Sequence, residues 1–343
     1  MNQKSQYRVA CLGAGYFSQF HYDAWRRMPC VALVGSADHN LDAARATGLP
    51  AYAELHEMLV ETKADILDII LPPGAHREAI DIALEIGVKT IICQKPFCID
   101  LAEATGVTER AEAAGTNLIV HENIRFMPWY RAIRSAIDAG QIGTPLQASF
   151  RLRPGDGQGP RAYLDRQPYF QQMPRFLIHE TGVHWIDTFR FLFGDPTAVY
   201  ADLRQINPAI SGEDAGFFLL DHPGGVRTLF DGNRHCDHVS DNHRRTMGDA
   251  EFEGTDGTLT LSGDGSVRFR AKGDVVAETL LAPDTAGGFG GDCVHHLQNH
   301  VINALRTDSG FENTARSYLD VLRIKDAIYL SAETGRKIFL VES

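Results

Sequence analysis

The stretch Tyr7-Arg-Val-Ala-Cys-Leu-Gly-Ala-Gly-Tyr-Phe-Ser18 decides the fold. Its first six residues are largely apolar and of β type, Gly13-Ala14-Gly15 predicts a tight turn, and residues 16–28 predict a helix. Glycines let the backbone approach a pyrophosphate, and the helix start presents N–H groups and a positive dipole end to that anion. Ser18 replaces the third glycine of the G-x-G-x-x-G fingerprint but is still small. The stretch predicts a dinucleotide site, with an ordinary tight turn as the alternative.

The composition favours a protein of two domains without a broad polyanion-binding surface. The chain has 343 residues, with 33 basic and 44 acidic side chains and a formal charge of −11. Such a charge argues against a nucleic-acid partner and against an anionic membrane surface. The six cysteines form no C-x-x-C pair, no apolar run is long enough for a bilayer, and no leader or export signal precedes the first strand. We therefore expect a soluble, reduced protein of the cytoplasm.

Strand and helix patterns alternate five times in about 120 residues, as in a doubly wound parallel sheet. The expected strands after the first are residues 31–37, 64–71, 88–93 and 117–120, with helices between them. Ligands of such sheets bind at the carboxyl ends of the strands, where the glycine turn, Asp38, Pro72-Pro73 and Lys95 all fall. This convergence favours a nucleotide site over a bare turn.

Asp38 ends the second expected strand, 25 residues after Gly13. A carboxylate there accepts hydrogen bonds from an adenosine ribose and repels a 2′-phosphate, so NAD is favoured over NADP. His39 and Arg45 lie close enough in sequence to keep NADP as an alternative. A second alternative is that Asp38 only caps the helix that starts near Leu41.

Lys95 follows the fourth expected strand and is fixed by Pro96. Its ammonium could hydrogen-bond a substrate hydroxyl and the negative charge that develops on that oxygen. An exposed loop lysine is the alternative.

Several motifs together resemble the Gfo/Idh/MocA family, the glucose–fructose oxidoreductase and inositol dehydrogenase group. They are the glycine turn, Pro72-Pro73, Gln94-Lys95-Pro96, His121 to Pro128 and Glu180 to Asp187. The resemblance implies a Rossmann domain joined to a mixed-sheet domain that helps form oligomers, and oxidation or reduction of a sugar or cyclitol hydroxyl with NAD(P). It also implies that Lys95, the lysine of the family's Glu-Lys-Pro motif, is catalytic. Gln94 departs from that motif and removes one charge.

The second half fits this resemblance by its own pattern. We expect a nucleotide-binding domain over residues 1–125 and a substrate-binding and oligomerisation α+β domain over residues 126–343. The latter has an expected helix at 128–139, a strand at 146–152, and short alternating runs over 198–281 that predict an antiparallel meander. Two helices, near 292–306 and 313–333, and a strand at 337–341 complete it.

Residues 176–193 predict one helix that carries Glu180, His184 and Asp187 on a single face, at positions i, i+4 and i+7. Histidine is suited to take a hydroxyl proton near neutral pH, and a neighbouring carboxylate would orient its ring. Glu180 stands where the resembling family has an aspartate. A solvated polar face is the alternative.

The Gly- and Pro-rich segment 151–175 carries five arginines against Asp156 and Asp165. Arginine pairs with carboxylate or phosphate, which hints at a sugar acid, whereas solvated arginines and internal ion pairs are the alternative. A neutral pyranose or inositol remains equally open. The group His235, Cys236, Asp237, His238 and His243 matches no standard zinc spacing, so we expect no metal.

The full expected site has three parts. The catalytic residues are Lys95, Glu180 and His184. The cofactor-binding residues are Gly13, Ala14, Gly15, Tyr16, Phe17, Asp38, Pro72, Pro73, His76, Gln94 and Lys95. The substrate-binding residues are Lys95, Glu122, Arg125, Arg153, Arg161, Tyr163 and His184.

These residues predict an NAD-dependent dehydrogenase of a polyhydroxylated small molecule, as a homodimer or homotetramer joined through the C-terminal sheet. One alternative is an enzyme that retains NAD and uses transient oxidation for glycoside cleavage or isomerisation. The other is a non-catalytic sugar or dinucleotide sensor.

Overall fold

The computed structural model describes residues 6–285 and 288–340. By its contacts the chain forms two compact units, one of residues 1–123 with 294–322 and the other of residues 124–293 with 323–343. Among the described residues, every helix is too short or too polar to span a lipid bilayer. The two units are considered separately.

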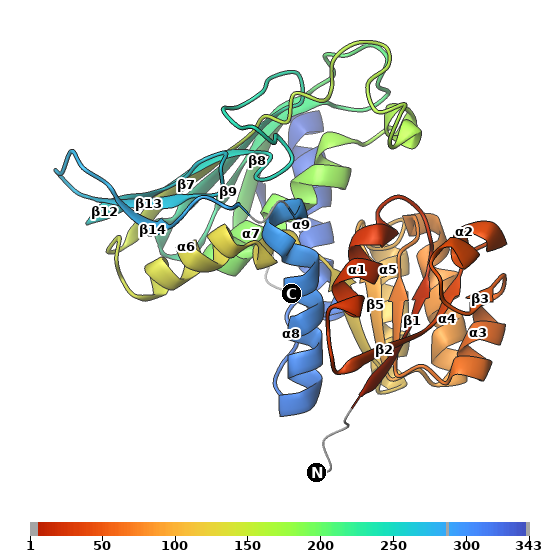
Figure 1. Cartoon of the computed structure of the whole chain (residues 1–343). Coiled ribbons are helices and arrows are strands. Elements are labelled where there is room, and N and C mark those ends of the chain that lie inside the picture. The colour runs from red at the N-terminus through yellow and green to blue at the C-terminus, as the bar shows by residue number, and fades with distance from the viewer. Residues whose placement is uncertain (1–5, 286–287, 341–343) are drawn as a thin grey trace. The chain divides into compact units, whose positions relative to one another are not determined.

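The first unit is built on a six-stranded, all-parallel sheet in the order β3-β2-β1-β4-β5-β6. Helices cover both faces (Figure 1), with α3, α4 and α5 packed side by side. This confirms the predicted doubly wound sheet, whose order reverses between β1 and β4. The strands are β1 Tyr7–Leu12, β2 Val31–Ala37, β3 Ala51–Tyr52, β4 Ile66–Ile69, β5 Thr90–Gln94 and β6 Asn117–His121, and the helices are α1 Ser18–Arg26, α2 Leu41–Ala46, α3 Leu55–Thr62, α4 His76–Ile86 and α5 Leu101–Ala113.

The segment 294–322 packs with the first unit although it lies far along the sequence. It holds most of α8 (Cys293–Thr307) and the start of α9 (Ala315–Thr334). The amide of Asn313 donates to the backbone oxygen of Glu122 at 2.7 Å, and Arg316 pairs with Glu112 at 2.5 Å. The contacts therefore group this segment with the parallel sheet, whereas the assignment of a function to each sequence domain stays a prediction.

The second unit contains a nine-stranded mixed sheet in the order β14-β13-β12-β11-β7-β10-β9-β8-β15. Its pairs are antiparallel except β7 with β10, so the predicted open, mainly antiparallel sheet is confirmed but its centre is not a simple meander. The strands are β7 Pro145–Leu152, β8 Ala198–Arg204, β9 Ala215–Asp221, β10 Arg227–Asn233, β11 Gly248–Gly254, β12 Gly257–Leu261, β13 Val267–Ala271, β14 Glu278–Leu281 and β15 Ile338–Phe339.

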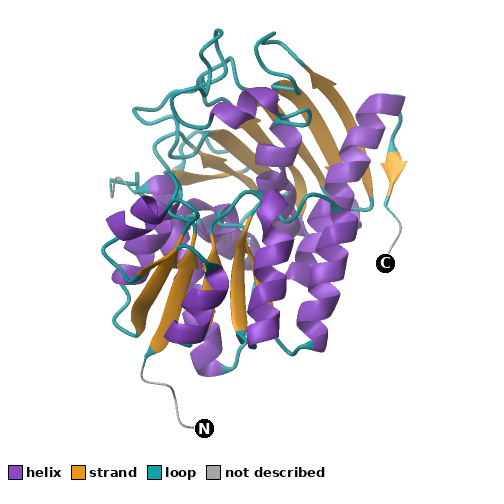
Figure 2. Ribbon diagram, turned by 90° about the vertical axis from the view of Figure 1, so that its right-hand side faces the viewer, coloured by secondary structure: helices purple, strands orange, loops and turns teal. Residues whose placement is uncertain are grey.

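Helices α6 (Pro128–Asp138) and α7 (Val183–Phe193) lie against one face of this sheet (Figures 1 and 2). Aromatic side chains fill the layer between them. Trp185 of α7 stacks on Phe150 at 4.1 Å between ring centroids, and Phe218 stacks on Phe230 at 4.8 Å. Buried aromatic pairs of this kind anchor α7, and with it the residues that precede and follow Trp185.

Candidate active site

The glycine turn of the first unit has the backbone geometry that the sequence predicts. Gly13 has φ +107°, and a Cβ there would lie 2.4 Å from the backbone oxygen of Ile70. A side chain at Gly13 is therefore excluded both by conformation and by space. At Gly15, by contrast, a Cβ would meet no atom of the described residues within 4 Å. The turn thus leaves open space beside Gly15 at the start of α1, as a bound pyrophosphate requires.

Asp38 lies directly against this turn. Its carboxylate accepts a hydrogen bond from the backbone N–H of Ala14 at 2.7 Å and another from that of Asn40 at 2.8 Å. The helix that follows is capped by Asn40, whose side-chain oxygen accepts from the N–H groups of Asp42 and Ala43 at 3.2 and 3.3 Å. The alternative role of Asp38 as the cap of that helix is therefore wrong. The geometry fits a ribose-binding carboxylate next to a pyrophosphate turn.

The other predicted cofactor residues form the same edge of the sheet. Tyr16 is 46% exposed, and Phe17 packs on Phe20 with 5.2 Å between ring centroids. Pro72 and Pro73 lead into a short 3₁₀ turn, Pro73–Ala75, after β4. Their contact with a cofactor stays a prediction.

His76 is fully buried at the base of that 3₁₀ turn. Its Nε2 donates to the backbone oxygen of Leu71 at 2.7 Å, and its Nδ1 accepts from the N–H of Cys98 at 3.3 Å. Burial lowers the pKa of His76 to about 4, so the ring is neutral. With both nitrogens bonded to backbone groups, His76 shapes the turn from inside, and a direct contact with a cofactor stays a prediction.

Lys95 follows β5 directly, and its backbone is held by Gln94. The Oε1 of Gln94 accepts from the Lys95 N–H at 3.0 Å, while its Nε2 lies 2.8 Å from Nε2 of His21. His21 in turn contacts the carboxylate of Asp68 at 2.8 Å. Sequence reasoning missed His21 and Asp68. The signal was present, because Asp68 places a charge within a strand that is otherwise apolar and buried.

The predicted helix 176–193 is two different segments in the structure. Residues Leu177–Gly182 form a π-helical turn, and α7 begins only at Val183. A π turn is wider than an α turn, so the i, i+4 rule of the α-helix does not apply across it. The expectation that one regular α-helix carries Glu180 and His184 on a single face is therefore wrong. His184 itself lies in the first turn of α7 and is 7% exposed. Glu180 thus lies in the π turn and His184 in the helix that follows it, and their catalytic roles stay predictions.

Glu180 is part of a buried cluster around Arg234, which sequence reasoning missed. Arg234 is 5% exposed, and its guanidinium pairs with Asp156 at 3.1 Å and with Glu180 at 3.4 Å. It also donates to the hydroxyl of Thr181. The phenol of Tyr163, a predicted substrate residue, donates to Asp156 at 3.0 Å, and burial raises the pKa of that phenol. Arg234 therefore fixes the loop that carries Tyr163 to the π turn that carries Glu180.

Asp187 and Arg125 form a second buried pair within this unit. The Arg125 guanidinium donates from two nitrogens to the Asp187 carboxylate, at 2.5 and 2.7 Å. Bidentate pairing of this kind fixes both side chains. Asp187 was expected beside His184, and Arg125 was expected at the substrate. The structure shows Asp187 and Arg125 bonded to each other.

In the first unit, Glu122 is fully buried and accepts from the Tyr318 hydroxyl at 3.1 Å.

The arginines of segment 151–175 all have acidic partners. Arg161 pairs with Asp165 at 2.9 Å and Arg166 with Asp156 at 3.3 Å, while Arg153 pairs with Asp231. Arg151 lies 3.5 Å from Asp249, and Arg175 lies 3.8 Å from Asp326. Internal ion pairs, the alternative considered from the sequence, are thus what the structure shows, and a sugar acid as substrate stays an untested prediction.

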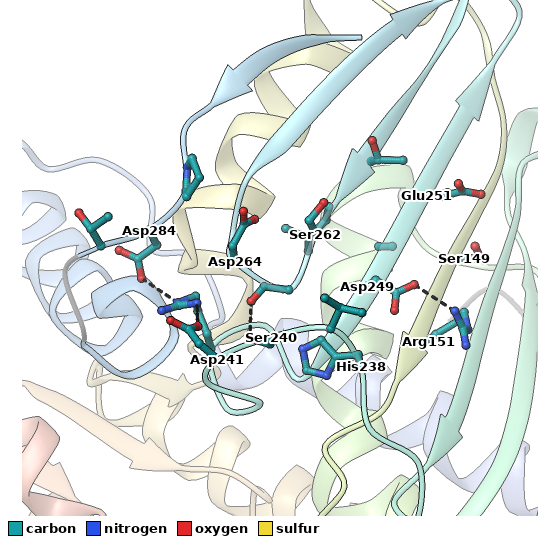
Figure 3. Close-up of a pocket in the computed structure, with 18 residues that line it drawn as sticks. Ser149, Arg151, His238, Ser240, Asp241, Asp249, Glu251, Ser262, Asp264 and Asp284 are labelled. Atoms are coloured by element: carbon teal, nitrogen blue, oxygen red, sulfur yellow. Dashed lines mark hydrogen bonds and ion pairs between the residues drawn. The ribbon is translucent and has the colours of Figure 1, made fainter. Parts of the chain in front are cut away.

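The second unit also has a polar hollow of about 930 Å³ on the sheet (Figure 3). It is formed by β7, β11, β12 and the loop 238–245, and it is lined by residues other than Glu180 and His184. Figure 3 shows Arg151 paired with Asp249, and Arg245 bonded to Asp241 and to Asp284. His238 reaches this hollow, but within residues 6–285 and 288–340 no group of three or more His, Cys, Asp or Glu side chains could hold a metal.

Comparison with known proteins agrees with this geometry. Residues 7–122 match the model of an oxidoreductase family with an NAD-binding Rossmann fold, and residues 130–260 match the GFO/IDH/MocA C-terminal domain. D-apiose dehydrogenase of Paraburkholderia graminis is 32% identical over 349 residues, which cover 98% of this chain and 90% of that protein. Inositol 2-dehydrogenase of Rhizobium meliloti is 27% identical over 236 residues, or 66% of this chain and 68% of the other.

A solved structure shares the fold over almost the full length. It is an oxidoreductase from Agrobacterium radiobacter in complex with NAD+, L-tartaric acid and magnesium, with a TM-score of 0.88 and 24% identity over 97% of this chain and 98% of the other. The fold and the strand-end site thus define a nicotinamide-dependent oxidoreductase. The chain belongs to the Gfo/Idh/MocA family.

Proposed function

We propose that the chain oxidises or reduces one secondary hydroxyl of a small, neutral polyhydroxylated molecule, a sugar or cyclitol, with NAD. Family membership makes it an NAD-binding dehydrogenase acting on a hydroxyl group of this class. The observation that carries the proposal is the end-to-end similarity to D-apiose dehydrogenase. Neutral substrates are favoured over sugar acids because the arginines of segment 151–175 are paired with acidic side chains within the chain.

The first unit supplies the cofactor site in this proposal. The open space at Gly15 fits a pyrophosphate, and Asp38 fits a ribose. A carboxylate at that place repels the 2′-phosphate of NADP, and Arg45 is paired with Asp42 at 3.0 Å, so NAD is the preferred cofactor. When bound, NAD accepts the hydride. The remaining cofactor contacts, from Tyr16, Phe17, Pro72, Pro73, His76 and Gln94, belong to this proposal.

The chemistry of the protein is proton transfer and charge stabilisation. His184 takes the hydroxyl proton as the hydride leaves the same carbon, and Lys95 stabilises the charge that develops on the oxygen. Glu180, held by Arg234, provides a fixed carboxylate in the π turn before His184. Glu122, Arg125, Arg153, Arg161 and Tyr163 are proposed to shape the substrate pocket, either directly or through the ion pairs described above.

We also propose that residues 1–125 bind NAD and residues 126–343 bind substrate and form a homodimer or homotetramer through the large sheet. Exposed apolar side chains support such an interface, since Leu146 of β7, Tyr200 of β8 and Phe339 of β15 are 51, 37 and 74% exposed. The six cysteines are all free thiols, which supports a reducing compartment such as the cytoplasm.

A substrate screen tests the function directly. Polyols, aldoses, inositols and sugar acids are incubated with NAD and with NADP, and formation of the reduced nicotinamide is followed by absorbance. We expect turnover of neutral sugars or cyclitols with NAD. Reduced cofactor that forms but never leaves the protein would instead support the transient-oxidation alternative, and tight sugar binding without any redox change would support the sensor.

A further inference from the structure

A buried hydrogen-bond chain in the first unit runs from the middle of β4 to the backbone of Lys95. Asp68 contacts His21 at 2.8 Å, His21 contacts Gln94 at 2.8 Å, and Gln94 accepts from the Lys95 N–H at 3.0 Å. Asp68 and His21 are fully buried, and Gln94 is 6% exposed. The three side chains come from β4, α1 and β5, so the hydrogen bonds join two neighbouring strands to the helix that follows the glycine turn. Polar groups are costly at such sites unless each has its partner.

The direction of every bond in this chain follows from one backbone group. The Lys95 N–H can only donate, so the Gln94 atom that faces it is the amide oxygen. The Gln94 NH₂ group therefore points to His21, whose Nε2 must accept with a lone pair. The ring proton is then on Nδ1 and is donated to Asp68.

Two further donors converge on the same carboxylate oxygen. The indole N–H of Trp25 reaches Oδ2 of Asp68 at 2.8 Å, and the amide of Gln298 reaches it at 3.4 Å. An indole N–H can only donate, so Asp68 is an acceptor in at least two bonds. The geometry thus describes an accepting Oδ2 of Asp68, an imidazole that donates from Nδ1 and accepts at Nε2, and an amide that donates to it.

We propose that Asp68, His21 and Gln94 are positioning residues that set the backbone at Lys95, and that the amide of Gln94 is required because a neutral His21 offers it only an acceptor. The inference rests on the proposed role of Lys95 in the hydride-transfer step. A carboxylate at position 94 has no proton to donate. It could complete the chain only if His21 carried a second proton, so Gln94→Glu should make the positioning depend on pH.

Three titratable side chains near Asp68 neither take up nor release a proton near neutral pH. The Cys11 thiol from β1, the Cys93 thiol from β5 and the Tyr22 phenol from α1 lie near Asp68, and burial raises the pKa of all three. They remain protonated. The His121 ring from β6 lies tilted against the His21 ring with 4.1 Å between centroids, and Phe17, the residue before α1, meets the His21 ring in a T-shaped contact at 5.7 Å.

The first experiment needs no turnover. Imidazole ¹⁵N spectra, with His21→Asn used for assignment, are expected to show a neutral His21 protonated on Nδ1 in the wild-type protein and a doubly protonated ring in Gln94→Glu. Amide exchange at Lys95 is expected to quicken more than about tenfold in Gln94→Met, because the acceptor of that N–H is lost. A ring protonated on Nε2 in the wild type, or unchanged exchange in Gln94→Met, would overturn the proposal.

The second experiment measures kcat and KM against pH. Gln94→Met is expected to lose about 10–100-fold in kcat at every pH, because the Lys95 N–H loses its acceptor. Gln94→Glu should stay within about fivefold of wild type at low pH and approach the Met variant as pH rises and His21 loses its second proton. Gln6→Glu, an exposed change at the start of the same sheet, is the control. Equal pH profiles for Gln94→Glu and Gln94→Met would contradict the requirement for a donor.

The two experiments separate this inference from the proposed function. If no substrate is turned over, the proposed function fails. The spectra and the amide exchange at Lys95 still decide whether the hydrogen bonds from Asp68 to Lys95 form and hold the backbone. If turnover is normal and Gln94→Met has wild-type kcat, the positioning role fails and the proposed function stands.

Discussion

The predicted cofactor residues of the first unit and the predicted substrate residues of the second are held by different kinds of bond. In the first unit, the predicted residues bond to backbone groups at strand ends, as Asp38 does to Ala14 and His76 to Leu71. In the second unit, charged side chains bond to each other, as Arg125 does to Asp187 and Arg234 to Asp156. Backbone sites follow from the local order of strand and turn, whereas ion-pair sites depend on residues far apart in sequence. We therefore propose that turn geometry positions the cofactor and that the charge network positions the residues that act on the substrate.

The largest expected effect is the loss of the proposed base. His184→Ala should lower kcat by about 10²–10⁴-fold and leave the affinity for NAD unchanged, because the ring acts on the substrate proton while the cofactor site is built by the first unit. Steady-state kinetics and a fluorescence titration with NAD measure the two quantities. His56→Ala, an exposed histidine of α3, is the control. Near-normal turnover of the His184 variant would remove this residue from the role of base.

The contribution of an ion pair to the free energy of unfolding should depend on how deeply the pair is buried. Arg125→Met leaves the buried Asp187 carboxylate without its bidentate partner, which is expected to cost about 3–5 kcal/mol in free energy of unfolding. Arg161→Met breaks a pair whose side chains are 74 and 83% exposed, and should cost less than about 1 kcal/mol. Urea unfolding measures both. Similar losses would show that burial does not separate the two kinds of pair.

Each unit contains a buried neutral histidine that should make it sensitive to acid. Burial lowers the pKa of His76 in the first unit and of His222 in the second to about 4 each. The unfolded chain takes up these protons near pH 6.5. The free energy of unfolding therefore has its full value above about pH 6.5 and falls as the pH drops toward 4. At pH 4 the loss is about 3 kcal/mol for each histidine.

The pH dependence of urea unfolding, compared between wild type, His76→Gln and His222→Gln, checks this linkage. The free energy of unfolding should fall less steeply between about pH 6.5 and 4 in each variant, because one proton fewer is taken up on unfolding. An unchanged slope in either variant would show that the corresponding ring is not buried as a neutral group.

The smallest expected effect concerns the choice of cofactor. Asp38→Ala removes the carboxylate that would repel a 2′-phosphate and bind a ribose, so the ratio of kcat/KM for NAD over NADP should fall about tenfold. Glu57→Ala, which removes an exposed carboxylate of α3, is the matched control and should leave the ratio unchanged. A preference for NAD that survives in Asp38→Ala would place cofactor selection elsewhere in the turn.

Local sequence order predicted the first unit well and the second unit less completely. The glycine turn, the strand ends and Lys95 could be located because each follows a short apolar run. The strand β3 was missed since its two residues, Ala51 and Tyr52, carry no detectable pattern and depend on pairing with β2. The parallel pairing of β7 with β10 was missed for the same reason, as it joins segments about 80 residues apart.

The candidate site shows the same limit at the level of single residues. Lys95 and His184 were found through motifs. The pair of Arg234 and Asp156 was missed, because the two residues are 78 positions apart and no sequence periodicity connects them. The π turn at Leu177–Gly182 also escaped prediction, since residue propensities do not distinguish it from an α turn. Asp68 could have been noticed as a charge in a buried strand.

We propose that Lys95 and His184 serve one chemical step. Single-turnover reduction of NAD in Lys95→Met, His184→Ala and the double variant tests it most directly. If both groups act on the same oxygen, the double variant should be at most about tenfold slower than the slower single variant. Rate losses that multiply in full would contradict the claim, because they would show two independent contributions.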